Sequence, residues 1–269
     1  NTLTIGGSYA YTIQNGILTV ARSANSGTIT VTSDTANVNH IISSRVISNE
    51  QNLTIDIENT NGYLRLDNIG SIASLNKMGD GTLEYTGASP DVFLQTSAGT
   101  LELSGGFTFN QGVVNPNNGT VLMSATDGSP KLSGSMSGTG VVSKTGAATL
   151  VISGTNTYSG GTTITEGTLQ TGSDSSIGTG AISLNGGTFQ TTSSFTSGKA
   201  FTMDAASTIN VNSGTTLTLT DGGFSGSNAI TKSGDGTLVL GADNSSFSGG
   251  ITISGGTLSA SAANNLGTG

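Results

Sequence analysis

Residues 144–172 read KTGAATLVISGTNTYSGGTTITEGTLQTG, and residues 232–261 repeat most of this pattern as KSGDGTLVLGADNSSFSGGITISGGTLSAS. The lysine, the glycine two positions later and a Thr-Leu-Val tripeptide coincide in the two copies. The second copy then has one extra residue. After this insertion the two copies also share the Gly-Gly pair, an isoleucine and a Gly-Thr-Leu tripeptide. A third, weaker copy begins at Lys77 with KMGDGTLEY. Repeats of this length are typical of solenoids and other repeat architectures.

The spacing of the Gly-Thr-Leu and related tripeptides indicates which repeat architecture is present. They recur about every twenty residues, the length of one β-solenoid coil, and each opens an alternating run such as TLEY at 82–85. Because a strand has a period of two, alternate side chains face the core and solvent. The sequence therefore predicts an all-β, parallel β-solenoid. The residues predicted to point inward are Leu83, Leu101, Leu150, Leu169, Phe189, Leu238 and Leu258, and those predicted to face solvent are Glu84, Glu102, Gln170 and Gln190.

The segments at 150–173 and 238–261 resemble the autotransporter-associated β-strand repeat, a unit of passenger domains in bacterial type V secretion systems. The shared pattern is a leucine strand, an asparagine, an aromatic residue, Ser-Gly-Gly, an isoleucine strand and Gly-Thr-Leu. This resemblance implies a right-handed parallel β-helix on the surface of a Gram-negative bacterium. It also implies attachment to the membrane only through a barrel domain, which this sequence does not contain. We expect a single β-helical segment over 1–269, with less regular coils in 1–75, a degenerate repeat with loops in 76–130 and regular repeats in 131–269.

The composition argues against several classes of function. Eight lysines and arginines without a basic patch argue against nucleic-acid binding. The absence of cysteine excludes disulfides and thiolate chemistry. No apolar run reaches the length of a transmembrane helix. Asn1 is not an initiator residue and 266–269 match the middle of a repeat, so we expect this sequence to be a piece of a longer secreted protein.

Candidate binding residues lie in the first 75 positions, which contain every arginine and the only histidine of the sequence. These candidates are Arg22, His40, Arg45 and Arg65. The alternative is that they are solvated positions on the early coils, because most charged side chains simply face water. Phe93, Phe107 and Phe109 are expected in the core or at corners, with an aromatic binding patch as the alternative.

The sequence predicts no catalytic residues, no metal site and no cofactor. Glycoside hydrolysis usually needs two carboxylates at a set separation, and the carboxylates here are scattered. Asp80 and Asp235 occupy equivalent Gly-Asp-Gly-Thr-Leu positions, where we expect them to form turns. A catalytic serine needs a base such as histidine, and the only histidine has no Gly-x-Ser-x-Gly motif near it. The Gly-Asp-Gly triplets do not recur every nine residues, as they do in calcium-binding repeats. Thr-x-Thr runs at 28–32 and 216–220, typical of ice-binding solenoids, do not recur in every coil and reflect the strand propensity of threonine.

The function that we expect from the sequence is a structural stalk, an adhesin, or both, without enzymatic activity. Rows of polar side chains would make repeated weak contacts with a host cell surface, the extracellular matrix or sister molecules. Two alternatives stay open: a secreted effector that binds a host receptor, and a β-helical polysaccharide lyase or hydrolase, which would need a groove of clustered carboxylates. The expected location is extracellular or on the bacterial outer-membrane surface.

Overall fold

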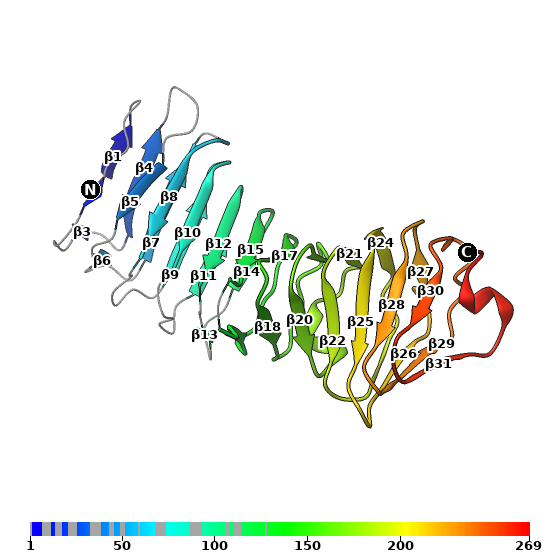
Figure 1. The fold of residues 1–269 in the computed structure, drawn as a ribbon. Helices are drawn as coiled ribbons and strands as arrows, with labels where there is room; N and C mark the ends of the chain where they lie inside the picture. The colour runs from blue at the N-terminus through cyan, green and yellow to red at the C-terminus, as the bar shows by residue number, and fades with distance from the viewer. Residues whose placement is uncertain are drawn as a thin grey trace.

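The computed structural model describes residues 2–6, 12–13, 18–20, 26–32, 39–42, 46–48, 52–58, 60–67, 74–86, 93–105, 108–109, 114–126 and 128–269. Its strands wind in successive coils along a rod, from β1 at one end to β31 at the other (Figure 1). All strand pairs among the described residues are parallel, and the helical elements there are two 3₁₀ turns, η1 (Asp174–Ile177) and η2 (Ala263–Leu266). The predicted all-β, parallel β-solenoid is therefore confirmed.

The largest sheet extends along most of the rod. It contains eleven described strands in the order β2 (Thr12–Ile13), β5 (Asn39–Ile42), β8 (Tyr63–Leu66), β10 (Thr82–Tyr85), β12 (Thr100–Ser104), β15 (Thr120–Ser124), β17 (Val141–Thr145), β19 (Thr162–Ile164), β21 (Ile182–Asn185), β24 (Phe201–Ala205) and β27 (Phe224–Ser225). We call it the long sheet.

Two further sheets accompany the long sheet in the first half of the chain. A six-stranded sheet contains β1 (Thr2–Gly6), β4 (Ser26–Thr32), β7 (Asn52–Ile57), β9 (Ser74–Met78), β11 (Phe93–Thr96) and β14 (Val114–Pro116). A two-stranded sheet contains β3 (Leu18–Val20) and β6 (Val46–Ser48).

From residue 108 onward, the long sheet is accompanied by an eight-stranded sheet, and from residue 195 also by a four-stranded sheet. The eight-stranded sheet contains β13 (Thr108–Phe109), β16 (Lys131–Leu132), β18 (Thr149–Ile152), β20 (Thr168–Thr171), β22 (Thr188–Thr191), β25 (Ser207–Val211), β28 (Ile230–Ser233) and β30 (Ile251–Ile253). The four-stranded sheet contains β23 (Phe195–Ser197), β26 (Thr216–Leu219), β29 (Thr237–Leu240) and β31 (Thr257–Ala260).

The register of these sheets stacks apolar side chains directly on one another. Leu83 pairs with Leu101 in the long sheet, and Leu169 lies between Leu150 and Phe189 in the eight-stranded sheet. Six of the seven residues predicted to point inward are fully buried: Leu83, Leu101, Leu150, Leu169, Phe189 and Leu238. Leu258, in the last coil, packs against the core but is only partly buried. The four residues predicted to face solvent alternate with buried neighbours and are half-buried, not fully exposed.

Aromatic side chains form a continuous column inside the second half of the rod. Phe189 contacts Phe201, which contacts Phe224, which contacts Phe247, all edge to face with ring centroids 5.6, 6.1 and 5.7 Å apart. Edge-to-face contact is favoured by the quadrupoles of aromatic rings, because the positive edge of one ring meets the negative face of the next. Phe93, by contrast, is half-buried on the outer side of β11, because it alternates with the buried Leu94. Phe107 lies outside the described residues, and Phe109 is described only as part of strand β13.

A buried lysine marks the start of each sequence copy. The three side chains are fully buried, and their stems lie in the apolar interior: Lys77, Lys144 and Lys232. The ammonium of Lys144 donates to the carbonyl oxygens of Thr145 and Gly146 at 2.6 Å and of Glu166, one coil further on, at 3.2 Å. Equivalent carbonyl triads hold the ammonium groups of the other two lysines. Each lysine thus ties its own corner to the next coil.

The glycine two residues after each lysine is required by this corner. Gly146 has φ 74°, a conformation that side chains rarely adopt. A Cβ atom at this position would also lie 2.5 Å from the carbonyl oxygen of Ala125 in the preceding coil. Asp80 and Asp235 are exposed on the bends that follow such glycines, as expected for turn residues.

Because of its buried lysines, we expect the free energy of unfolding of the rod to increase as the pH rises from 8 towards 10. Burial lowers the pKa of Lys77 and Lys144 from 10.5 to about 8. Between these values the unfolded chain binds more protons than the folded chain, so the free energy of unfolding increases with pH. Burial raises the pKa of Tyr158, which opposes the gain above pH 10, where unfolded tyrosine ionises.

This expectation is checked by thermal unfolding at pH 7.5, 8.5 and 9.5. The melting temperature should rise over this range, and the rise should be smaller in Lys144→Met. The exposed Lys131 offers the control, because Lys131→Met should keep the full rise. An identical pH profile in Lys144→Met and Lys131→Met would contradict the assignment.

Candidate functional site

The structure describes the side chain of one of the four candidate binding residues. Arg22 and Arg45 lie outside the described residues. His40 belongs to β5, where it is paired with Leu64 of β8. Arg65 lies on β8 with its side chain on the outer face of the long sheet, where its exposed fraction is 40%.

Arg65 is the first member of a charged row across three successive coils. In the register of the long sheet, Arg65 pairs with Glu84, and Glu84 pairs with Glu102. The Nε of Arg65 lies 2.7 Å from the carboxylate of Asp67 and 3.9 Å from that of Glu84. The row lines a groove of about 300 Å³, whose other lining residues are Thr86, Ser104, Gly105, Ser124 and Thr126.

The two glutamates of this groove have different environments. Glu84 accepts hydrogen bonds from the hydroxyl groups of Tyr63 and Ser104. Glu102 is half-buried and lies beside the charge of Glu84, and both effects raise its pKa, although a hydrogen bond from Ser124 opposes them. Two carboxylates thus stand next to each other on one open face.

This meeting of charges was not predicted from the sequence, where the carboxylates look scattered, although Leu83 and Leu101 are predicted to point inward on equivalent strands. A signal was present, because residues that directly follow stacked leucines must stack as well. In the described part of the chain, no three His, Cys, Asp or Glu side chains are arranged to hold a metal ion. The groove is therefore a polar, mixed-charge surface that could hold a hydrogen-bonding ligand.

A second polar surface follows the outer face of the eight-stranded sheet. Six threonines occupy one position in successive strands: Thr149, Thr168, Thr188, Thr208, Thr231 and Thr252. Two residues further along the strands, Gln170, Gln190, Asn210 and Ser233 form a parallel row. Adjacent members of a row are about 4.8 Å apart, the spacing between paired strands. We call these two rows the threonine–amide face.

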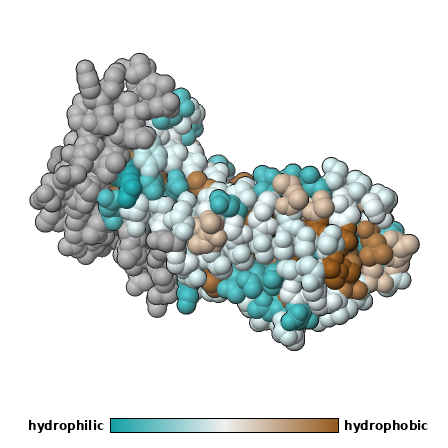
Figure 2. All heavy atoms as spheres, in the orientation of Figure 1, coloured by the Kyte–Doolittle hydropathy of each residue, from teal (hydrophilic) through white to brown (hydrophobic). Residues whose placement is uncertain are grey.

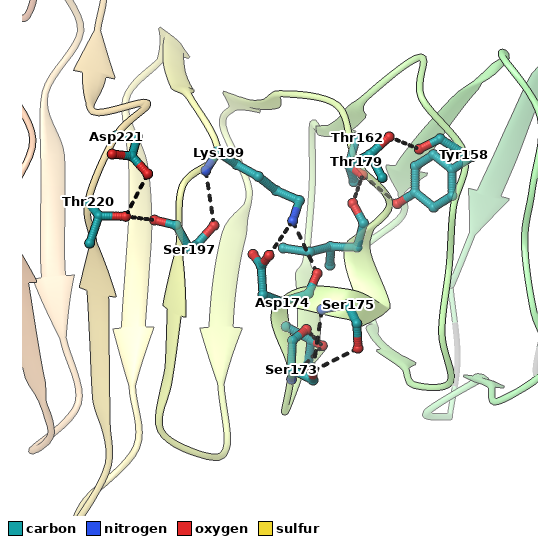
Figure 3. Close-up of polar contacts among 12 residues, drawn as sticks. Tyr158, Thr162, Ser173, Asp174, Ser175, Thr179, Ser197, Lys199, Thr220 and Asp221 are labelled. Atoms are coloured by element: carbon teal, nitrogen blue, oxygen red, sulfur yellow. Dashed lines mark hydrogen bonds and ion pairs between the residues drawn. The ribbon is translucent and has the colours of Figure 1, made fainter.

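An ion pair fastens one corner of the regular half. Lys199 precedes β24 and its ammonium lies 2.7 Å from the carboxylate of Asp174 at the start of η1 (Figure 3). It also donates to the main-chain oxygen of Asp174 at 3.2 Å. The hydroxyl of Tyr158 meets that of Thr162 at 2.6 Å in the neighbouring corner (Figure 3). These bonds fasten both corners, while the second carboxylate oxygen of Asp174, Oδ1, is buried without a hydrogen-bond partner among the described residues.

Comparison with known families finds two matches within the regular part of the rod. A family model described as the passenger-associated-transport-repeat matches residues 142–170 and 230–260. The chain contains two passenger-associated-transport-repeats. The resemblance to an autotransporter passenger with repeats is thereby confirmed, and such passengers are secreted or displayed at the cell surface. No curated protein and no solved structure matches the chain.

The structure shows what two polar residues shared by both matched segments do. Besides its lysine, each repeat contains a buried asparagine that spans three coils. Asn156 accepts a hydrogen bond from the backbone N–H of Met136 at 2.7 Å and donates to the carbonyl of Ser176. Asn244 of the second repeat makes equivalent bonds to Phe224 and Asn265. Sequence reasoning recognised that these residues recur but did not predict their roles, which depend on coils about twenty residues away.

Proposed function

We propose that this passenger segment is a non-enzymatic adhesive stalk on the surface of a Gram-negative bacterium. The observation that supports this function best is the threonine–amide face, where threonine hydroxyl groups repeat over six strands and amide groups over three, at one spacing. Such groups form hydrogen bonds without charge, and each contact is individually weak. Repetition along a rod multiplies these contacts, and avidity can exceed the single affinity by 10²–10⁴. Host cell surfaces, matrix polymers or sister molecules are the proposed partners.

Display on a non-adherent bacterium tests this proposal. Cells carrying the rod should attach to host cells or matrix, or should clump, more than cells carrying an empty display system. The triple variant Gln170→Ala, Gln190→Ala and Asn210→Ala should lose most of this gain. A matched control on the long sheet is Ser143→Ala, Thr163→Ala and Ser183→Ala, which also changes three stacked outward positions. Equal attachment of displaying and empty cells would refute the adhesive function.

The groove around Arg65 is the observation that favours the alternative of a polysaccharide-acting enzyme. It brings the carboxylates of Glu84 and Glu102 together, and a pair of neighbouring carboxylates is typical of enzymes that hydrolyse glycosides. Our proposal predicts that the purified rod releases no reducing or unsaturated ends from pectins or other glycans. It also predicts that Glu102→Gln leaves attachment unchanged. Glycan cleavage that is abolished by Glu102→Gln and retained by Glu166→Gln would establish the enzyme instead.

A further inference from the structure

The six threonine hydroxyl groups of the threonine–amide face are not engaged within the protein. In the part of the chain that the structure describes, none of these hydroxyl groups makes a hydrogen bond to another residue. Threonines at the corners of the same half differ, because the hydroxyl groups of Thr165 and Thr192 donate to carbonyl oxygens of the preceding coil. None of the ten side chains of the face is fully buried. The threonine row therefore keeps its hydrogen-bonding capacity for a ligand.

The amide row also keeps part of its capacity. The side-chain nitrogen of Gln190 donates to Asn212 at 2.9 Å, and that of Asn210 donates to Ser233 at 3.1 Å. These bonds fix the two amides and leave their carbonyl oxygens as acceptors. The two rows lie about 7 Å apart, because a strand rises by about 3.3 Å per residue. Both rows run along the rod, so each coil presents one hydroxyl group and one polar partner beside it.

The composition of this face indicates an uncharged partner. Its ten residues are all neutral, and an exposed charge of the same sheet, Lys131, pairs with Val151 before the amide row begins. A charged polymer would find no counter-charge along the rows. Strands β20, β22, β25 and β28 lie side by side in the second half of the rod (Figure 1), and Figure 2 shows that most of the surface there is neutral or hydrophilic.

The face also lacks the side chains that anchor protein partners. Binding hot spots between proteins are enriched in tryptophan, tyrosine and arginine, and they lie in well-packed pockets. The threonine–amide face contains none of these three residue types. What it offers is a straight series of hydroxyl and amide groups, and a polymer that carries hydroxyl groups at a regular spacing matches this chemistry.

We propose that the threonine–amide face binds an uncharged, extended glycan of the β-1,4-linked type, which lies along the rod with one sugar ring over each coil. This inference rests on the proposed adhesive function and names the partner of its face. The rings of such a chain follow one another at close to the spacing of paired strands, about 4.8 Å. Alternate rings are turned over, and hydroxyl groups suit this because they both donate and accept. No carboxylate belongs to the face, so the glycan is held without being cleaved.

Soluble oligosaccharides test this proposal on the purified chain. The probes are hexamers of β-1,4-linked glucose, mannose and N-acetylglucosamine, and NMR follows the side-chain amide signals of Gln170, Gln190 and Asn210. At least one hexamer should bind roughly tenfold or more tightly than its own trimer, because each further coil adds the same contacts. The α-1,4-linked glucose hexamer is the control, because its chain coils and cannot follow straight rows. It should bind at least tenfold more weakly than the best β-linked hexamer.

A triple variant removes three hydroxyl groups and keeps the branched side chains that favour strands: Thr168→Val, Thr188→Val and Thr208→Val. It should lose at least tenfold in affinity for the hexamer that binds. The matched control changes three stacked outward positions of the long sheet and should keep the original affinity: Ser143→Ala, Thr163→Val and Ser183→Ala. Equal melting temperatures of the two variants show that both are folded.

The glycan proposal is overturned if none of the three β-linked hexamers binds, if the two linkages bind equally, or if the triple variant binds as well as its control. Bacterial display separates these results from the adhesive function. If displaying cells attach or clump although no hexamer binds, the adhesive function stands and the partner is a protein or a second copy of the chain. If a hexamer binds but displaying cells do not attach, the glycan site stands and the adhesive function fails.

Discussion

Replacing Lys144 by alanine is expected to lower the free energy of unfolding by about 3 to 5 kcal/mol. Two losses contribute to this figure, and the removed desolvation cost of the buried ammonium offsets part of their sum. The first is the buried stem, since truncation of a large core side chain to alanine typically costs about 2–5 kcal/mol. The second is the ammonium, whose removal takes hydrogen-bond donors away from three carbonyl groups at a corner between two coils. Urea unfolding followed by circular dichroism measures the difference.

Two further variants separate these contributions. Lys144→Met keeps most of the stem and removes the charge, so it should cost about 1 to 3 kcal/mol, the range for unsatisfied buried polar groups. Lys131→Ala changes an exposed lysine of the neighbouring coil and should stay within about 0.5 kcal/mol, as surface substitutions do. If Lys144→Ala and Lys131→Ala unfold at the same urea concentration, the carbonyl triad does not stabilise the corner.

Replacing Leu169 by alanine should destabilise the rod by roughly 2–5 kcal/mol, because its fully buried side chain lies between Leu150 and Phe189. The two neighbouring coils are held by their own backbone pairing, so they cannot easily collapse into the cavity that the truncated side chain leaves. Gln170 is the matched control in the next position of the same strand. It points outward, and Gln170→Ala should cost no more than about 0.5 kcal/mol.

The midpoint of urea unfolding distinguishes these two variants without any functional assay. A large shift for Leu169→Ala and almost none for Gln170→Ala is expected from their alternation along β20. Equal shifts would mean that the inward and outward faces of this strand have been assigned incorrectly. The same comparison for Phe189 and Gln190 in the next coil would show whether the assignment extends along the ladder.

The candidate groove shows how far sequence reasoning reached towards a site. Arg65 was predicted as a binding candidate, and Glu84 and Glu102 were predicted to point outward. Glu84 and Glu102 follow leucines of two Gly-Thr-Leu strands, so their pairing left a signal in the sequence, whereas the pairing of Arg65 with Glu84 depends on a third strand outside that pattern. The buried roles of Lys144 and Asn156 were missed for a related reason. Their partners lie in neighbouring coils, and a recurring polar residue in a sequence does not reveal whether its side chain points inward.

The sequence by itself determined the structure of a single coil, that is, its strands and its corners. Alternation of apolar and polar residues, the Gly-Thr-Leu tripeptides and the glycine corners act over a few residues, so strand faces and turns could be predicted without tertiary contacts. Only the tertiary structure decided on which face each repeat lies. Lys77, Lys144 and Lys232 begin equivalent copies, yet they lie in the six-stranded, the long and the eight-stranded sheet respectively. The copies are 67 and 88 residues apart, which are not whole multiples of a coil of about twenty residues. Each copy therefore begins in a different sheet. The lengths of all the strands and corners between two copies add up, and strand pairing with core packing then decides in which sheet the next copy lies.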